Sequence, residues 1–205
     1  MRSIGSVCVY CGSSAGRNPA FEGAARAFGR VLAESGVRLV YGGGGLGLMG
    51  ALARSVLAHG GQVTGVIPSF LMEQEHSLEM VQEHIVTDDM HQRKQIMFDH
   101  ADGFVALPGG VGTLEELVEQ LTWVQLGRHA KPVVIANLDG YWEPLLAMID
   151  HMRQEGFIQK TPAVAFRVAD TVEDIVPTLE DAAAEARRKG LAPKPTTAVE
   201  PLPRL

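Results

Sequence analysis

The sequence predicts one α/β domain over residues 1–190, a doubly wound, Rossmann-like parallel sheet with helices on both faces. Short apolar runs alternate along the chain with longer stretches of helical periodicity, which is the pattern of parallel strands joined by helices. Glycine clusters follow several apolar runs and precede helical stretches, as at ligand sites of α/β proteins. Residues 191–205 carry four prolines and little apolar pattern, so we expect a disordered tail there.

The expected strands are short and nearly continuous in apolar residues, so both of their faces should be buried. The first apolar stretch is interrupted by Gly5 and Ser6 and is too short for a signal segment, so we interpret it as a strand. Residues 69–87 have a weaker pattern, in which a short strand around Ile85 is one interpretation. The other predicted strands are Ser6–Tyr10, Val37–Tyr41, Gln62–Ile67, Gly103–Leu107, Pro132–Ala136 and Ala163–Val168.

Residues that are typical of helix N-termini and C-termini indicate where the helices between these strands begin and end. Asn18 followed by Pro19 is typical of an N-cap and first helical residue, and Gly36 ends that helix. Thr171 and Asp174 have the spacing of a capping box, which predicts the start of a final helix that ends near Gly190. The remaining helices are expected from about Leu46 to His59, from Asp88 or Asp89 to His100, from Thr113 to Leu126, and from Tyr141 to Gln154.

The composition excludes several classes of protein. Of 205 residues, 46% are hydrophobic, which is enough for one buried core. With 18 Lys and Arg against 24 Asp and Glu, the formal net charge is −6, so the chain lacks the basic footprint of a protein that binds nucleic acid polymers or anionic membranes. No apolar run reaches the roughly 18 residues of a membrane-spanning helix, and we expect a cytoplasmic protein.

The glycine run Gly42–Gly50 contains the GxGxxG spacing of dinucleotide-binding proteins twice, between a predicted strand and a predicted helix. The next strand, however, ends in Ile67 and Pro68 rather than in the acidic residue that would bind a ribose hydroxyl. An NAD-dependent enzyme is therefore disfavoured. We expect at least half of these glycines to serve a tight turn and close packing of helix on strand.

A second glycine loop, Pro108–Thr113, also joins a predicted strand to a predicted helix. No lysine follows its last glycine, so it is not a Walker A loop. Free N–H groups at a helix N-terminus, with the helix dipole behind them, bind a phosphate without a cationic side chain. We expect this loop to hold one phosphate group, mainly through backbone donors.

Glu116 has two interpretations. The spacing from Thr113 to Glu116 matches a capping box, in which the carboxylate would serve only the helix N-terminus. Alternatively, a carboxylate beside a phosphate loop activates water or stabilises a developing cation. Arg93 and Lys94 lie near the start of another predicted helix, where cations are unfavourable, which indicates either an anionic partner or simply a solvated charge pair.

Three motifs of this chain resemble one family. Pro108-Gly-Gly-x-Gly-Thr-x-x-Glu116, Met90-His-Gln-Arg-Lys94 and Tyr41-Gly-Gly-Gly-x-x-Gly-Leu-Met-Gly50 are similar to motifs of the LONELY GUY (LOG) family. Its members are cytokinin riboside 5′-monophosphate phosphoribohydrolases, many of them labelled in error as lysine decarboxylases. The resemblance covers roughly residues 4–185, with the three motifs in the family's order.

The resemblance implies that Arg93 and Glu116 form the catalytic pair. Residues 75–83 depart most from the family pattern, which leaves the base preference open. The candidate substrate contacts lie in the loop after the first strand, in the glycine loops, on the helix that follows the second of them and in the Met90–Lys94 motif, together with one carboxylate between Gly50 and Met90. They are Ser13, Gly43, Gly44, Glu75, Lys94, Gly109, Gly110, Val111, Gly112, Thr113, Leu114, Glu115 and Thr122.

The chemistry implied is hydrolysis of the N-glycosidic bond of N6-modified adenosine 5′-monophosphates to free base and ribose 5-phosphate, with AMP as a second substrate. Such a bond breaks through an oxocarbenium-like sugar, which the Glu116 carboxylate can stabilise while it orients water. Arg93 would hold the phosphate or the ribose hydroxyls, or orient Glu116 through a bidentate pair that keeps it ionised at neutral pH. No metal or organic cofactor is needed, and the resemblance implies a homodimer.

The competing interpretation is a carrier of nucleotides or of molybdenum cofactor without hydrolase activity. A carrier needs the phosphate loop but not the pair of Arg93 and Glu116, so the presence of both favours an enzyme. Cys8 and Cys11 form a C-x-x-C, but the first lies within a predicted strand, and we expect structural residues rather than a redox or zinc site. The scattered histidines predict no metal site.

Overall fold

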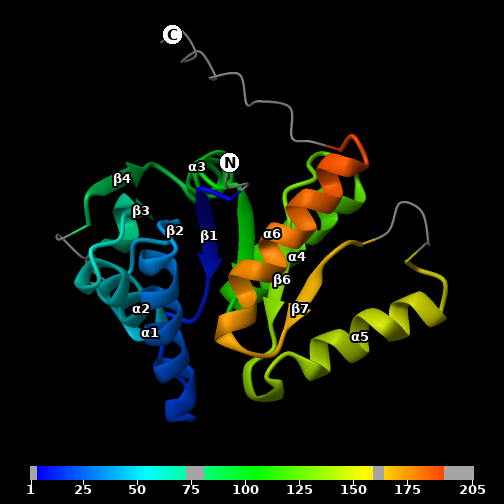
Figure 1. The fold of residues 1–205 in the computed structure, drawn as a ribbon, viewed down its shortest axis with the longest axis horizontal. Helices are drawn as coiled ribbons and strands as arrows, with labels where there is room; N and C mark the ends of the chain where they lie inside the picture. Colours follow the sequence, from blue (N-terminus) through cyan, green and yellow to red (C-terminus); the bar gives the residue numbers. More distant parts are fainter. Residues whose placement is uncertain (1–3, 73–80, 159–163, 192–205) are drawn as a thin grey trace, which may run out of the picture.

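The protein is described here by a computed structural model, which covers residues 4–72, 81–158 and 164–191. In these ranges, seven strands form one sheet in the order β4-β3-β2-β1-β5-β6-β7 (Figure 1). Every neighbouring pair is parallel. The strands are β1 (Ser6–Tyr10), β2 (Arg38–Tyr41), β3 (Val63–Pro68), β4 (Glu83–Thr87), β5 (Gly103–Ala106), β6 (Val133–Ala136) and β7 (Arg167–Ala169).

The order of the sheet reverses between β1 and β5. The chain adds β2, β3 and β4 on one side of β1, and then crosses over to add β5, β6 and β7 on the other side. β1 and β5 pair from Val7 with Gly103 to Tyr10 with Ala106, so their carboxyl ends lie next to each other. Ligands of open α/β sheets bind outside the strand ends at such a switch point. The predicted fold class is confirmed, and it brings the loops after β1 and β5 together.

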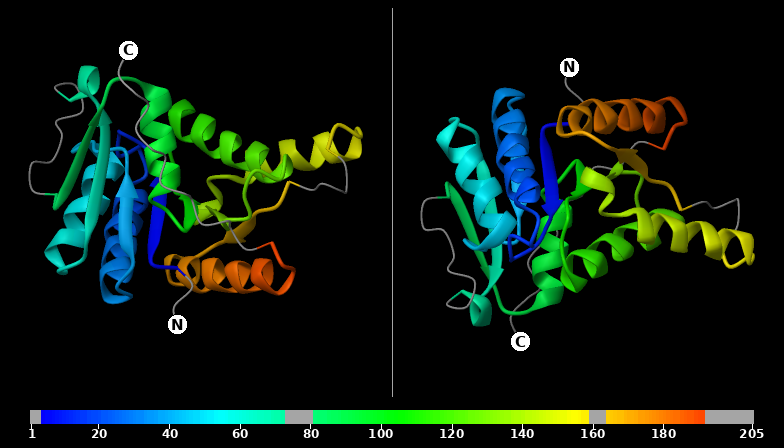
Figure 2. Two further views of the ribbon diagram at one scale, coloured as in Figure 1. Left: turned by 90° about the horizontal axis from the view of Figure 1, so that it is seen from above. Right: turned by 90° about the horizontal axis from the view of Figure 1, so that it is seen from below.

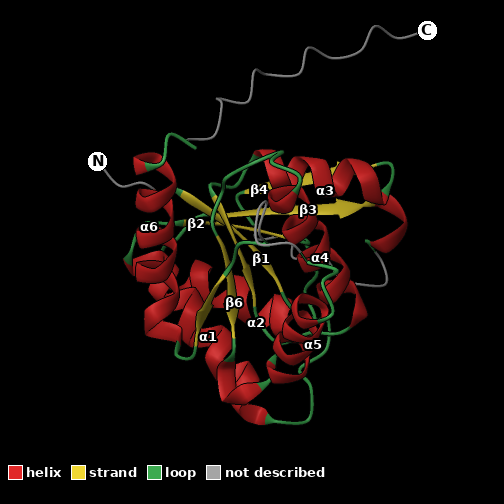
Figure 3. Cartoon of the chain, turned by 90° about the vertical axis from the view of Figure 1, so that its right-hand side faces the viewer, coloured by secondary structure: helices red, strands yellow, loops and turns green. Residues whose placement is uncertain are grey.

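Helices cover both faces of the sheet (Figures 2 and 3). α1, α2 and α6 pack on one face, and α3, α4 and α5 pack on the other. Side chains of each strand alternate between the two cores, so that in β1 Val7 and Val9 face the first core while Cys8 and Tyr10 face the second. The helices are α1 (Pro19–Glu34), α2 (Gly47–Ala58), α3 (Met90–Asp99), α4 (Val111–Gln125), α5 (Glu143–Gln154) and α6 (Val172–Arg188), with short 3₁₀ turns η1 (Ser69–Leu71) and η2 (Leu138–Gly140).

Most predicted elements are confirmed, including the short strand around Ile85, which is β4. The last strand is shorter than predicted and spans Arg167–Ala169, with Ala163 outside the described residues. The capping box at Thr171 is wrong, although Thr171 is the N-cap of α6. Its hydroxyl donates to the Asp174 carboxylate at 2.6 Å and accepts no backbone N–H, so the reciprocal bonds do not form. Except for Leu191, the expected tail also lies outside the described residues.

The packing of α1 on α2 depends on Gly29. A Cβ atom at this position would lie 2.7 Å from the Leu52 carbonyl oxygen and 2.7 Å from the Ser55 Cβ atom. We expect Gly29→Ala to lower the free energy of unfolding by about 2 kcal/mol, because the two helices must separate to admit the methyl group. Denaturant unfolding monitored by circular dichroism measures the change.

Gly23 is the matched control, because it lies in the same helix and a Cβ atom there would meet nothing within 4 Å. Gly23→Ala should stabilise the protein by about 0.5–1 kcal/mol through the higher helix propensity of alanine. Equal effects of the two substitutions would contradict the packing argument.

Candidate active site

The loops after β1 and β5 are tied together at the carboxyl edge of the sheet. The Gly12 N–H donates to the Pro108 carbonyl oxygen at 3.1 Å. Gly109 permits this approach, because a Cβ atom there would lie 2.9 Å from the Gly12 nitrogen and 2.7 Å from the Thr113 Cβ atom. The start of α4 is therefore held directly beside the end of β1.

At the first glycine loop, Gly42–Gly50, a backbone carbonyl group of the protein already accepts hydrogen bonds from the N-terminus of α2. The N–H groups of Leu48 and Met49 in α2 both donate to the Gly12 carbonyl oxygen, at 3.0 and 3.3 Å. Gly47 has a φ of +54°, and a Cβ atom there would overlap the backbone of Ser13. The prediction that many of these glycines serve a turn and close packing is confirmed at Gly47. The donors that a dinucleotide pyrophosphate would need are already used.

At the second glycine loop, the helix N-terminus is open. The N-cap of α4 is Gly110, which has no side chain to cap the helix. The N–H groups of the first turn have no acceptor within a helix. A Cβ atom at Gly110 or Gly112 would meet nothing within 4 Å, so there is free space in front of the loop. The N–H groups of Val111 and its neighbours thus face a space that an anion can enter, with the helix dipole behind them.

Glu116 does not cap α4. Because the helix begins at Val111, Thr113 is already its third residue and Glu116 lies a further turn along. The capping-box interpretation is therefore wrong, since a carboxylate at this depth cannot return to the N-cap. Instead the Glu116 side chain is on the buried side of α4 and only 9% exposed.

Glu116 lies beside Arg93 of α3. The Glu116 Oε1 and Arg93 Nη2 atoms are 3.9 Å apart, and Arg93 is as deeply buried as Glu116. The Arg93 guanidinium also donates to the Gly42 carbonyl oxygen at 3.3 Å, and a side chain at Gly42 would overlap it. Asp89 caps α3 by accepting from the Gln92 N–H at 2.8 Å, which fixes the helix start from which Arg93 extends. One buried pair thus joins α3, α4 and the end of β2.

Burial dominates the electrostatics of Glu116. It raises the pKa of Glu116 to about 7, against the opposing effect of the Arg93 charge. The bidentate pair expected from the sequence is not formed, because a single approach of 3.9 Å is too long for a hydrogen bond. The structure therefore lacks the bidentate pair that would have kept this carboxyl ionised at neutral pH. A carboxyl with a pKa near 7 is suited to accept and return a proton during catalysis.

Lys94 links α3 to α4 next to this pair. Its ammonium donates to Glu115 Oε1 at 2.7 Å and to Glu119 Oε1 at 3.0 Å. Partial burial opposes the charge, but the hydrogen bonds to Glu115 and Glu119 outweigh it and raise the pKa of Lys94. Lys94 and Glu115, both predicted as substrate contacts, therefore contact each other in this structure.

The other predicted substrate contacts lie in several different elements and differ in how buried they are. Ser13 is exposed in the loop after β1, and Gly43, with a φ of +76°, packs against Ile67 of β3. Gly44 is buried in the first glycine loop, and Leu114 packs partly buried against the core under α4. Thr122 lies on the exposed side of α4, where its hydroxyl donates to the Val118 carbonyl oxygen at 2.8 Å. Glu75 lies outside the described residues.

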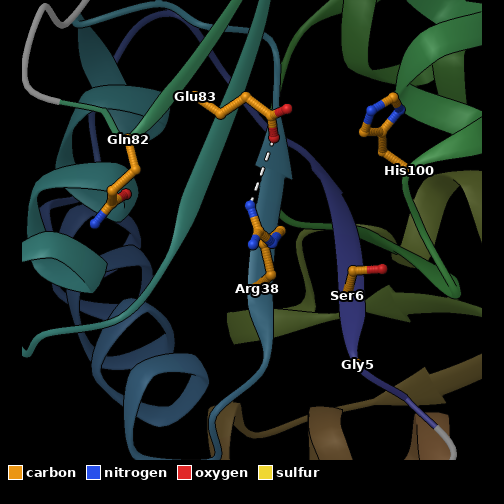
Figure 4. Close-up of a pocket in the computed structure, with 6 residues that line it drawn as sticks. All are labelled: Gly5, Ser6, Arg38, Gln82, Glu83 and His100. Carbon is orange, nitrogen blue, oxygen red and sulfur yellow. Dashed lines mark hydrogen bonds and ion pairs between the residues drawn. The ribbon is translucent and has the colours of Figure 1, made fainter.

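A separate hollow of about 710 Å³ lies at the opposite edge of the sheet, where β1, β2 and β4 begin (Figure 4). Its arginine, Arg38, is already engaged with Gln62 at 2.8 Å, Thr64 at 3.2 Å and Glu83 at 3.5 Å. The switch-point site is therefore the better candidate. The hollow is lined by Gly5, Ser6, Arg38, Gln82, Glu83 and His100.

Cys8 and Cys11 are unpaired and buried, and burial raises the pKa of both thiols, as fits the structural role expected for them. Across the described ranges, no three His, Cys, Asp or Glu side chains come close enough to hold a metal ion. None of the helices described is both long enough and apolar enough to span a membrane.

Comparison with known proteins decides the family. A family model described as "Possible lysine decarboxylase" matches residues 49–179, a range that includes Arg93 and Glu116. LOG1 of Arabidopsis thaliana, a cytokinin riboside 5′-monophosphate phosphoribohydrolase, is 47% identical over 175 residues, which cover 85% of this chain and 82% of that protein. The chain belongs to the LOG family. LOG of Oryza sativa subsp. japonica, of the same activity, is 47% identical over 85% of this chain and 72% of its own length.

Solved structures share the fold of this LOG-family chain. The molybdenum cofactor carrier protein of Chlamydomonas reinhardtii has a TM-score of 0.66 at 23% identity, over 87% of this chain and 98% of that one. The molybdenum cofactor binding protein of Rippkaea orientalis has a TM-score of 0.62 at 21% identity, over 86% and 94%. At these identities the likeness concerns the fold alone, and it agrees with the doubly wound sheet.

Three residues that were not predicted as site residues lie at this LOG-family site. Gly42 accepts from Arg93, Glu119 accepts from Lys94, and the Tyr141 hydroxyl donates to the Gly109 carbonyl oxygen. The position of Glu119, three residues after Glu116, places both carboxylates near one face of a helix and was the one available signal. The other two contacts join elements far apart in sequence, which no local pattern reveals.

Glu116 should make stability depend on pH. Its pKa of about 7 in the folded protein exceeds the ordinary value of 4.5, so the folded state keeps a proton that the unfolded state has lost. Stability is therefore lost as the pH rises from 4.5 to about 7. Glu116→Gln should match the unaltered protein near pH 4, below the unfolded pKa, and exceed its free energy of unfolding by up to about 3 kcal/mol at pH 8.

Urea unfolding at both pH values measures this difference. Glu155→Gln, at an exposed glutamate after α5, is the control for the loss of one negative charge and should not produce this gain. A Glu116→Gln variant that is less stable than the unaltered protein at pH 8 would contradict the cost assigned to the buried carboxylate.

Proposed function

We propose that this protein hydrolyses the N-glycosidic bond of N6-modified adenosine 5′-monophosphates, with AMP as a second substrate, and releases free base and ribose 5-phosphate. The observation that carries the proposal is the open N-terminus of α4 one turn before a buried carboxyl paired with Arg93. Relatives that are 47% identical over 85% of this chain have this activity in their names, which supports the same chemistry here.

The spacing along α4 suits a nucleoside monophosphate. From Val111, at the open end, to Glu116 the helix advances about 7.5 Å. The Glu116 side chain leans back toward the helix N-terminus, so the 5′-methylene and ribose of a nucleotide can bridge the remaining distance. A 5′-phosphate at the backbone N–H groups would therefore present the anomeric carbon to the Glu116 carboxyl. Gly110 and Gly112 leave the space in front of the helix clear for the phosphate oxygens.

Each residue then has a defined part in the reaction. The bond between the anomeric carbon and the base nitrogen breaks, and the ionised Glu116 stabilises the oxocarbenium-like sugar. Water adds to the anomeric carbon, Glu116 accepts one proton from that water, and Glu116 then passes this proton to the departing base, which returns the carboxylate to its ionised form. Arg93 holds Glu116 in place and favours its ionised form, against the effect of burial.

The test is incubation with AMP and with isopentenyl-AMP, with base and ribose 5-phosphate resolved by chromatography. We expect base to be released by the unaltered protein, and Glu116→Gln to lower kcat by roughly 10²–10⁴-fold, the usual contribution of a general acid–base group. The rate should rise with pH through about 7 as Glu116 ionises. Binding of either nucleotide without release of base would refute the hydrolase and favour the carrier.

We further propose that two copies of this chain form a homodimer through the exposed side of α4 and act in the cytoplasm. Val118 and Leu126 leave 44% and 70% of their surface exposed, at positions eight residues apart on one side of the helix. Met148 and Met152 of α5 are likewise exposed, at 52% and 40%. Exposed apolar side chains on these two helices, which cover the same face of the sheet, favour an interface between copies.

Sedimentation velocity tests this assembly. We expect the mass of a dimer for the unaltered protein, and dissociation to monomers in Leu126→Glu, because a buried unpaired charge opposes association. Arg30→Glu, on the exposed side of α1 across the sheet, is the control and should remain dimeric. A monomeric unaltered protein at micromolar concentration would refute the proposal.

A further inference from the structure

The loop between β6 and α5 reaches the phosphate loop through one side chain. The Tyr141 hydroxyl donates to the Gly109 carbonyl oxygen at 2.5 Å. Gly109 immediately precedes the N-cap of α4, whose first-turn N–H groups face open space. A third loop at the carboxyl edge of the sheet thus contacts the backbone of the candidate phosphate site.

The contact with Tyr141 also orients the N–H group of Gly110, because that group belongs to the same planar peptide as the Gly109 carbonyl. In a trans peptide, the carbonyl group of Gly109 and the N–H group of Gly110 point in opposite directions. A hydrogen bond that holds the carbonyl toward Tyr141 therefore turns the Gly110 N–H away from Tyr141. The peptide lies between two glycines, which have the widest choice of backbone conformation, so it needs an external contact to stay in one orientation.

Tyr141 is itself firmly placed. Its ring packs edge-on against Phe21 of α1, with ring centroids 5.3 Å apart, and against Trp142 at 5.0 Å. The turn before it contains Asp139 with a φ of +53°, an uncommon conformation outside glycine. The Asn18 side-chain amide donates to the Asp139 carboxylate at 2.7 Å and so ties this turn to the start of α1.

Asn137 anchors the same loop from the other side. Its side-chain oxygen accepts from the Trp142 N–H at 2.9 Å, and its amide donates to Glu143 at 2.9 Å. The hydroxyl of Tyr141 is therefore presented to Gly109 by a loop held at several points. Such a rigid support is what an oriented backbone donor requires.

We propose that Tyr141 is a positioning residue that orients the peptide between Gly109 and Gly110 for binding of the 5′-phosphate. The proposal rests on the proposed function, in which this loop holds that phosphate. Tyr141 acts through the loop and not on the reacting bond. Loss of its hydroxyl should therefore weaken binding of the phosphate and leave the chemical step unchanged.

Tyr141→Phe tests the proposal, because it keeps the ring contacts with Phe21 and Trp142 and removes only the donor. We expect the KM for AMP to rise roughly tenfold, the effect of one lost hydrogen bond, with kcat within about twofold of the unaltered protein. Calorimetry should show AMP bound about tenfold more weakly and adenosine, which lacks the phosphate, bound as before. Tyr41→Phe is the matched control, because the buried Tyr41 hydroxyl has no hydrogen-bond partner among the described residues.

The outcomes separate this role from the proposed function. Base release by the unaltered protein, with AMP affinity and KM unchanged in Tyr141→Phe, would overturn the role of Tyr141 alone. A variant in which adenosine binding or kcat falls as much as AMP binding would show a general structural effect and also overturn it. Tight AMP binding without base release would refute the hydrolase, yet weaker AMP binding by Tyr141→Phe would still support the positioning role. An unaltered protein that binds no AMP would refute both.

Discussion

The burial of the Glu116 carboxyl is the constraint on which the site depends. A carboxylate loses much of its hydration when buried, and a nearby opposite charge replaces only part of it. Arg93 supplies that charge from α3, while the Gly42 carbonyl oxygen accepts from the same guanidinium. Because the pair stays 3.9 Å apart, Arg93 offsets only part of the effect of burial, and the pKa of the carboxyl stays raised, at about 7. The folded state is therefore less stable when Glu116 is ionised, and the same burial lets this group exchange a proton near neutral pH.

The backbone of Gly12 decides which of two similar glycine loops is open. Its carbonyl oxygen accepts from the first turn of α2 and closes that helix N-terminus, while its N–H donates to Pro108 and draws the second loop close. The donors at the start of α4 then face free space. Gly12 can reach both glycine loops because it follows β1, which lies in the sheet between β2 and β5, the strands that the two loops follow.

The fold and the site differ in what they indicate about function. The molybdenum cofactor carrier protein of Chlamydomonas reinhardtii has this fold at 23% identity, so the fold by itself does not select an activity. Membership of the LOG family and the buried pair of Arg93 and Glu116 together point to hydrolysis.

The sequence by itself determined the succession of strands and helices along the chain and the two glycine loops, because strand and helix periods and turn residues are local properties. The pair of Arg93 and Glu116 was implied by the resemblance of three motifs to the LOG family. It left open whether Glu116 capped its helix, since spacing alone places the helix start at Thr113 as readily as at Val111. Only the tertiary structure decided that question. It alone also shows that the Gly12 carbonyl oxygen accepts from the N-terminus of α2, and that the Tyr141 hydroxyl donates to Gly109. These depend on burial and on contacts between distant segments, and the order of the sheet sets both.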